Sequence, residues 1–275
     1  MTAVALTTFA KADDPILRRE THDGIALLTL NRPASRNSLS LAMLEELIAA
    51  FAVIATERAV RAVVLAAEGP AFSSGHDLKE LTAHRADRDG GRGFFAKTWE
   101  RCGTMMQAIV RLPQPVIACV HGAAAAAGCQ LVASCDLAVA AVSATFSTPG
   151  VNIGLFCTSP MVPLSRNLAR KHAMDMLLTG EAISAADALR IGLVNRVVAA
   201  GEERAEAMRL AQRIASRSPT AIAIGKKAFY SQIEMDLAHA YDAAARIMVE
   251  NMMEADAQEG IAAFLAKRAP EWDNG

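Results

Sequence analysis

Two loops rich in small residues have the composition of a ligand site. The first, residues 71–80, reads AFSSGHDLKE and places Gly75 between a strand and a helix. A glycine at such a turn lets the backbone approach a ligand closely. The second, residues 121–130, reads HGAAAAAGCQ and also leads from a strand into a helix, where free N–H groups and the helix dipole favour an anionic oxygen. Taken alone, the first loop is more simply explained as an ordinary strand-to-helix turn, and the second as a turn in which alanines pack.

Strands and helices alternate in the part of the chain that must position these loops. Asp23-Gly24 between two β-rich runs is a hairpin signal, and Ser40 is a suitable N-cap for the helix that follows it. We expect strands at residues 16–21, 25–30, 62–67, 116–120, 136–141 and 193–198. We expect helices at residues 94–110 and 128–134, and others that begin near Ser159, Lys171, Ser184, Glu202, Pro219, Asp236 and Ala255. The polar, glycine-rich residues 82–93 predict a mobile loop or a lid.

Composition restricts the classes of function. The chain has 275 residues, of which 52% are hydrophobic, and its formal net charge is −1 from 28 basic and 29 acidic residues. The chain can therefore bury a large hydrophobic core. It has no run of basic residues interleaved with aromatic ones, so nothing indicates a nucleic-acid partner. No apolar run approaches the roughly 20 residues of a membrane span. No cluster has metal-ligand spacing, so we expect no nucleic-acid, membrane or metal partner.

The cysteines and the N-terminus indicate the compartment and the domain plan. The five cysteines lie in apolar surroundings without a CxxC pair, which is typical of reduced thiols in a cytosolic protein. Residues 1–14 lack the features of a secretory signal and are expected to be flexible. We therefore predict a cytoplasmic protein with an α/β core over residues 15–200. Residues 201–275 are predicted to form a helical layer that packs on this core.

The motifs, taken in order, resemble one family. They are Asn31-Arg32-Pro33 with RNSL at 36–39, then AFSSGHDLKEL, PVIACVHGAAAAAGCQLVASCDLAVA, FSTPGVNIGL, LLTGEAISAADALRIGLVNRVV and EGIAAFLAKRAP. Together they cover residues 16–270, and their order and spacing are similar to those of the crotonase superfamily, the enoyl-CoA hydratases and isomerases. The resemblance implies an α/β spiral of ββα repeats with a C-terminal helical layer used in oligomerisation. It also implies homotrimers or dimers of trimers and a lyase- or isomerase-type enzyme of fatty acid metabolism.

The resemblance also implies an acyl-CoA site with an oxyanion hole made of two main-chain N–H groups. By position these belong to His76 and Ala127, and a lost donor of this kind typically costs roughly 3 kcal/mol. Alanine at 126 and 127, where the family often has glycine, restricts φ. Coenzyme A enters as part of the substrate, with no permanently bound cofactor. The expected substrate-binding residues are Arg36, Ser38, Ser73, Gly75, Asp77, Leu78, Lys79, Ala126, Gly128, Pro149, Asn152, Leu155, Phe264 and Lys267. By the same resemblance, the last two are expected to contact the ligand of a neighbouring subunit.

Two expected catalytic positions depart from the hydratase pattern. Hydratases of the family hold and activate a water with two glutamates, and the matching positions here are Gln130 and Gly150. An amide holds water but cannot take its proton at neutral pH, and a positioned acid or base contributes about 10²–10⁴ in rate. One branch of the superfamily shares both the glutamine and the glycine. Replacement groups are sought among the side chains of His76, His84, Asn152, Cys157, Thr158 and Ser159.

Three functions remain open from the sequence. The first is a hydratase or isomerase that acts through the oxyanion hole. The second is another reaction through an enolate, such as thioester hydrolysis, decarboxylation or retro-aldol cleavage. The third is a non-catalytic acyl-CoA-binding protein, which the loss of both carboxylates motivates. Two of these side chains also have explanations without a catalytic role. His76 is explained if only its backbone N–H matters, and Cys157 is explained as a thiol buried for packing.

Overall fold

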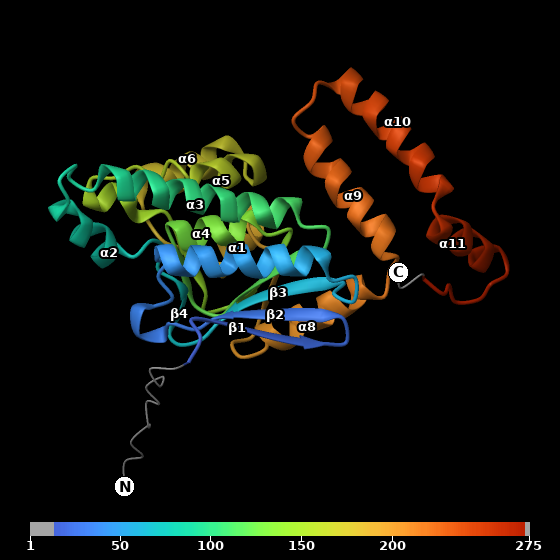
Figure 1. Ribbon diagram of the computed structural model, residues 1–275, viewed down its shortest axis with the longest axis horizontal. Helices are drawn as coiled ribbons and strands as arrows, with labels where there is room; N and C mark the ends of the chain where they lie inside the picture. Colours follow the sequence, from blue (N-terminus) through green and yellow to red (C-terminus); the bar gives the residue numbers. More distant parts are fainter. Residues whose placement is uncertain (1–13, 273–275) are drawn as a thin grey trace, which may run out of the picture.

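A computed structural model describes residues 14–272 and shows two sheets surrounded by helices (Figure 1). The six-stranded sheet has the order β1-β2-β3-β5-β7-β10, with only β1 antiparallel to its neighbour. Its strands are β1 Leu17–His22, β2 Ile25–Leu30, β3 Ala62–Ala67, β5 Val116–Val120, β7 Leu137–Ala141 and β10 Arg196–Val198. The four-stranded sheet, β4-β6-β8-β9, consists of β4 Ala71–Ser73, β6 Ala123–Ala125, β8 Thr145–Ser147 and β9 Ile183–Ser184.

From β3 to β8, consecutive strands alternate between the large sheet and the small sheet, and this alternation produces the ββα repeat. β3, β5 and β7 lie in the large sheet, and each is followed within a few residues by a short strand of the small sheet and then by helical structure. The expected spiral of ββα repeats is confirmed. The short strands β4, β6, β8 and β9 were not predicted, because two or three residues are too few to show an alternation of apolar and polar positions.

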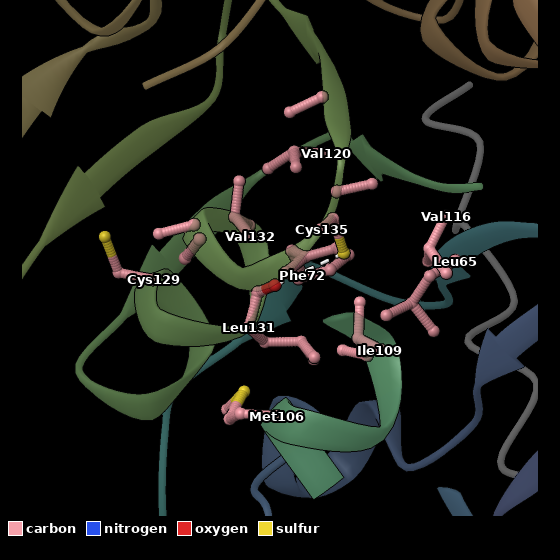
Figure 2. Close-up of a cluster of buried hydrophobic side chains, with 14 of the residues drawn as sticks. Leu65, Phe72, Met106, Ile109, Val116, Val120, Cys129, Leu131, Val132 and Cys135 are labelled. Carbon is pink, nitrogen blue, oxygen red and sulfur yellow. Dashed lines mark hydrogen bonds between the residues drawn. The ribbon is translucent and has the colours of Figure 1, made fainter. Parts of the chain in front are cut away.

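The helices cover both faces of the large sheet. Those of the core are α1 Leu41–Thr56, α2 Leu78–Ala83, α3 Arg92–Arg111, α4 Ala127–Ser134, α5 Met161–Asn167, α6 Arg170–Thr179, α7 Ala185–Ile191 and α8 Glu203–Ala215. α1, α3 and α4 pack over one face, where Figure 2 shows Met106 and Ile109 of α3 next to Leu131 of α4. α8 covers the other face with Ala207, Leu210 and Ala211.

The segment expected to be a loop or a lid at residues 82–93 is mostly helical. α2 continues to Ala83, a 3-10 turn spans His84–Ala86, and α3 already begins at Arg92. Asp89 explains the early start, because its carboxylate accepts hydrogen bonds from the N–H groups of Gly91 and Gly93 at 3.0 and 2.7 Å. The prediction of a long loop is therefore wrong, because the polar residues include Asp89, whose carboxylate binds N–H groups at the start of α3.

The C-terminal region divides into two parts. Within residues 201–275, α8 packs on the core, whereas α9 Pro219–Gln232, α10 Leu237–Met253 and α11 Ala255–Leu265 extend away from it (Figure 1). We call α9–α11 the arm. Its base is fixed to the body by Lys226, whose ammonium lies 2.6 Å from the partly buried Asp136 carboxylate. The expectation that residues 201–275 pack on the core thus holds only for α8, because in one chain the remaining helices form the projecting arm. That the arm is used in oligomerisation stays a prediction. The flexible N-terminus predicted for residues 1–14 lies, except for Asp14, outside the described residues.

Candidate active site

Three loops leave the small sheet at one edge. β6 pairs in parallel with β4 on one side and with β8 on the other. The segments that follow these strands, residues 74–77, 126–128 and 148–150, therefore emerge at the same edge, where ligands of parallel sheets usually bind. The Ala126 N–H donates to the Ser147 carbonyl at 2.9 Å and joins the second segment to the third.

Two glycines let the first and second loops touch through their backbones. Gly75 has φ +87°, and a Cβ there would lie 2.9 Å from the Ala126 Cβ and 3.1 Å from the Ala127 nitrogen. A Cβ on Gly128 would lie only 2.3 Å from the Ser73 carbonyl oxygen. Real Cβ atoms do not approach backbone so closely, so both glycines are required by the contact between the loops.

The contact places the two expected N–H donors on adjoining segments. His76 follows Gly75 directly, and Ala127 is the first residue of α4, where the N–H groups have no partner within the helix. Within residues 14–272 neither of these N–H groups donates to another protein group. Two unpaired donors on adjoining segments, one of them at a helix start, are suited to an anionic oxygen. Their use as an oxyanion hole stays a prediction.

Ala126, the residue between the two loops, has a strained backbone. It adopts φ 50° and ψ −117°, a conformation that favours glycine, and it directly precedes α4. The expected restriction of φ thus concerns Ala126, whereas Ala127 is helical. Strained backbone of this kind tends to gather at functional sites, where the surrounding contacts enforce it.

We expect Ala126→Gly to stabilise the protein by about 1 kcal/mol. Relief of strain contributes about 1–3 kcal/mol, and the greater freedom of glycine in the unfolded chain subtracts about 0.5–1 kcal/mol. Urea unfolding followed by circular dichroism measures the difference. Ala123→Gly is the matched control, because Ala123 is an exposed residue of β6 without positive φ and its replacement should destabilise. A destabilised Ala126→Gly variant would contradict the assignment of strain.

Gln130 stands on α4 at the wall of a cavity. Its side chain is 4% exposed, and its Oε1 receives a weak hydrogen bond from the Cys102 thiol at 3.8 Å. The cavity has a volume of about 550 Å³ and lies between α3, α4, α5 and the C-terminal end of α9. Apolar side chains line much of it, among them Met106, Val110, Val162, Phe229 and Ile233. Gln130 thus presents an amide, and no carboxylate, to this cavity.

Gly150 is closely packed. It is buried in the 3-10 turn Pro149–Ile153, and a Cβ on it would lie 2.7 Å from the Leu155 carbonyl oxygen and 2.9 Å from the Cys157 sulfur. The second glutamate of the hydratase pattern is therefore not simply missing. Its place is filled by the chain that follows the turn.

The His76 side chain is held as a neutral ring. Its Nδ1 lies 3.3 Å from the Leu39 carbonyl oxygen, and the ring packs against Trp99 at 5.1 Å between centroids. Burial lowers the pKa of His76, partly offset by the bond to Leu39. Its Nε2 is buried and has no hydrogen-bond partner within the described part of the chain.

The other candidate side chains lie at different places. His84 stacks on Phe94 and pairs with Asp87 at 2.8 Å on the surface, away from the three loops. Ser159 lines the cavity together with Gln130, and Asn152 lies beside Gly180 of the α6 end. Thr158 follows the buried Cys157, before α5.

The residues expected to contact coenzyme A fall into two groups. Ser73 and Ser38 are buried, and their hydroxyls donate to the Asn37 carbonyl at 2.9 Å and to the Asp77 carboxylate at 3.0 Å. Asp77 also caps α2, so these three side chains hold the loop together. Arg36, Leu78 and Lys79 are exposed beside it and remain free to meet a ligand.

Within one chain, Phe264 and Lys267 lie far from the first loop and its exposed residues Arg36, Leu78 and Lys79. Phe264 is 81% exposed on α11, and Lys267 follows that helix, at the opposite end of the molecule from α2 in Figure 1. Leu155, another expected contact, is half exposed and packs its carbonyl on Gly150.

Asn37 has a positioning role that the sequence interpretation missed. Its amide donates to the carbonyls of Glu68 and Ala71 at 2.7 and 2.8 Å, and its oxygen accepts from the Arg32 N–H at 2.8 Å. It therefore fixes the segment before α1 against the first loop. The signal available was an asparagine beside Arg36, a type of residue that tolerates the positive φ of 52° found here.

The fold and the paired loops define a protein of the crotonase class, a ββα spiral with free N–H groups at the edge of its small sheet. The enoyl-CoA hydratase/isomerase family model matches residues 20–275, and the chain belongs to this family. Among the residues that the structure describes, no helix has the length and apolar character to cross a membrane.

Similar proteins agree with the branch that the glutamine and glycine indicated. Human enoyl-CoA hydratase domain-containing protein 3, mitochondrial, is 49% identical over 92% of this chain and 82% of its own length. The crystal structure of that human protein matches with a TM-score of 0.89 and 47% identity over 94% of this chain and all of the other. An enoyl-CoA hydratase structure from Mycobacterium smegmatis matches with a TM-score of 0.90 and 52% identity, covering 94% of this chain and 99% of the other.

The comparisons correct the expected compartment. We predicted a cytoplasmic protein from the reduced cysteines and the absence of a secretory signal. The relatives from human, mouse and Xenopus laevis are named mitochondrial proteins, which overturns that prediction. Reduced, buried thiols do not separate the two compartments, so the cysteine pattern was too weak a basis.

Proposed function

We propose that this chain binds an acyl-CoA thioester at the edge of the small sheet and polarises its carbonyl oxygen with the N–H groups of His76 and Ala127. The contact between the two loops through Gly75 and Gly128 is the observation that carries this proposal, because it leaves both N–H groups unpaired beside the start of α4. Negative charge that develops on the thioester oxygen as an enolate forms would be stabilised there.

The surroundings of the loops suit the remainder of such a ligand. The cations Arg36 and Lys79 are exposed beside the first loop and would meet the phosphates of coenzyme A, which arrives as part of the substrate and not as a resident cofactor. The cavity beyond Gln130 would receive the acyl chain. We therefore assign the protein a lyase- or isomerase-type role on acyl-CoA substrates.

The filled space at Gly150 favours a reaction other than hydration. With an amide at position 130 and no room for a side chain at position 150, no carboxylate pair can activate a water. Other reactions use the same oxyanion hole without this carboxylate pair: decarboxylation and retro-aldol cleavage pass through an enolate, and thioester hydrolysis passes through a tetrahedral oxyanion.

The arm is proposed to join subunits into a homotrimer or a dimer of trimers. Within one chain, α9 and α10 have no buried residue, and Leu265, Leu237 and Tyr241 are 75%, 75% and 72% exposed. Apolar side chains on a projecting element require a partner surface. In such an assembly Phe264 and Lys267 would approach the ligand of a neighbouring subunit.

Calorimetric titration with butyryl-CoA and an assay of crotonyl-CoA hydration test the proposal together. We expect saturable binding of butyryl-CoA, tighter than that of free coenzyme A, because the carbonyl adds two hydrogen bonds. We expect crotonyl-CoA hydration to stay at the uncatalysed rate. No binding of any acyl-CoA would refute the site, and rapid hydration would refute the assignment away from hydration.

A further inference from the structure

Three arginines surround one pocket at the base of the arm, which we call the arginine pocket. Arg58 follows α1, Arg61 directly precedes β3, and Arg217 lies in the linker between α8 and α9. The pocket has a volume of about 380 Å³, which falls in the range of roughly 300–1,000 Å³ typical of small-molecule sites. Among the described residues that line it, none carries a carboxylate. The wall is therefore positively charged and attracts an anion.

Two of the three guanidinium groups are not neutralised by an acidic side chain. Arg58 and Arg217 are exposed, and within residues 14–272 neither forms an ion pair. Their long side chains can shift as a ligand enters, and a planar guanidinium binds a phosphate with two hydrogen bonds. Thr220 lines the same pocket in the first turn of α9, where its N–H has no backbone partner among the described residues.

Gln114 supplies a second, independent sign of a ligand. It lines the arginine pocket, is only 8% exposed, and its buried Oε1 has no hydrogen-bond partner in the described part of the chain. Its Nε2 donates to the Ile54 and Glu57 carbonyl oxygens at 2.9 and 3.4 Å, so turning the amide round would set its oxygen against two others. A buried acceptor without a donor is costly. A ligand N–H group would remove that cost.

The remaining wall of the pocket is apolar. Val60 and Pro113 come from the body of the protein, and Pro219 and Ile222 come from α9. Side chains of this kind cover the faces of a flat ring and remove its apolar surface from water. A ligand that matches the whole wall therefore carries a phosphate, a flat ring and an N–H donor on the edge of that ring.

We propose that the arginine pocket binds an adenine nucleotide. The phosphate would lie between Arg58 and Arg217, the adenine would lie on the apolar wall, and its amino group would donate to the Gln114 Oε1. The pocket shares no lining residue with the cavity at Gln130, and it lies where the arm leaves the body, at the end opposite α2 (Figure 1). It is therefore a second site, and it does not depend on the proposed acyl-CoA site.

Calorimetric titration of the whole chain tests the ligand. The probes are AMP, purine riboside 5′-monophosphate, which has hydrogen in place of the amino group, and inorganic phosphate. We expect saturable binding of AMP with a Kd below about 1 mM, and binding of the purine analogue about fivefold weaker or more, because the Gln114 Oε1 then stays unpaired. Equal binding of the two nucleotides, or binding of inorganic phosphate as tight as that of AMP, would overturn the proposal.

Arg217→Ala tests the place of binding. We expect the variant to bind AMP at least about tenfold more weakly than the wild type and to bind butyryl-CoA equally well. Arg213→Ala is the matched control, because Arg213 is an exposed residue of α8 that does not line the pocket. It should bind AMP as the wild type does, since both substitutions lower the net charge equally.

Coenzyme A itself contains an adenine nucleotide, so the AMP titration is repeated with saturating butyryl-CoA. Unchanged AMP affinity, together with the loss in Arg217→Ala, supports a second site. Displacement of AMP by butyryl-CoA, an Arg217→Ala variant that binds AMP within about twofold of Arg213→Ala, or no binding of AMP by the wild type overturns the proposal. If the wild type binds no butyryl-CoA, the proposed function fails, and the two arginine variants alone decide this inference.

Discussion

Gly128→Ala is expected to abolish acyl-CoA binding and to destabilise the protein by about 3 kcal/mol. The added methyl group would lie 2.3 Å from the Ser73 carbonyl oxygen and 2.8 Å from the Ser73 Cβ. Backbone cannot move aside as a flexible side chain does, so overpacking at this point costs the upper part of its usual range of about 1–3 kcal/mol. The two loops must separate, and the N–H groups of His76 and Ala127 separate with them.

Gly225→Ala is the control for this substitution. Gly225 lies within α9, and a Cβ there would meet nothing within 4 Å. Alanine should therefore stabilise this helix by about 0.5–1 kcal/mol and leave binding intact. Urea unfolding and titration with butyryl-CoA measure both effects. A Gly128→Ala variant that binds as well as Gly225→Ala would show that the contact between the loops does not make the site.

Restoring both hydratase carboxylates, with Gln130→Glu and Gly150→Glu together, is expected to fail. A side chain at 150 would collide with the Leu155 carbonyl at 2.7 Å and with the Cys157 sulfur at 2.9 Å. Crotonyl-CoA hydration should remain at the uncatalysed rate, although a positioned pair of carboxylates would otherwise add about 10²–10⁴ for each role. The turn at Pro149–Ile153 should also be destabilised, by about 1–3 kcal/mol.

The single variant Gln130→Glu separates steric from chemical causes. Position 130 borders the cavity, so glutamate fits there in place of the similar glutamine. This variant should fold normally and should also lack hydration, because a single carboxylate does not replace the pair. Hydration by the double variant at least about 100-fold above background would contradict the packing at Gly150 and would leave loss of the carboxylates as the full explanation.

Those parts of the fold that depend on long, buried runs were predictable. The six expected strands all exist and together form the large sheet. Runs such as AVVLAA at Ala62–Ala67 were readable because they are apolar on both faces. The small sheet was missed, since β4, β6 and β8 have three residues each and are fixed by their neighbours. The projecting arm was also missed, because an amphipathic helix has the same sequence pattern whether it covers its own core or another subunit.

At the candidate site, the motifs identified the positions of residues but not how those residues pack. The motif order selected the backbone at His76 and Ala127, and the structure brings these segments together through Gly75 and Gly128. It could not show that Cys157 fills the place of a side chain at Gly150, because that contact arises from the turn after Pro149 and not from any local pattern.

Infrared difference spectroscopy of bound [1-¹³C]butyryl-CoA tests the central claim most directly. Two hydrogen bonds from the N–H groups of His76 and Ala127 would weaken the thioester C=O bond. We therefore predict that the isotope-sensitive C=O band moves to lower frequency in the complex than in free butyryl-CoA, and that Gly128→Ala shows no such band. A saturated complex whose C=O band stays at the frequency of the free thioester would contradict the account.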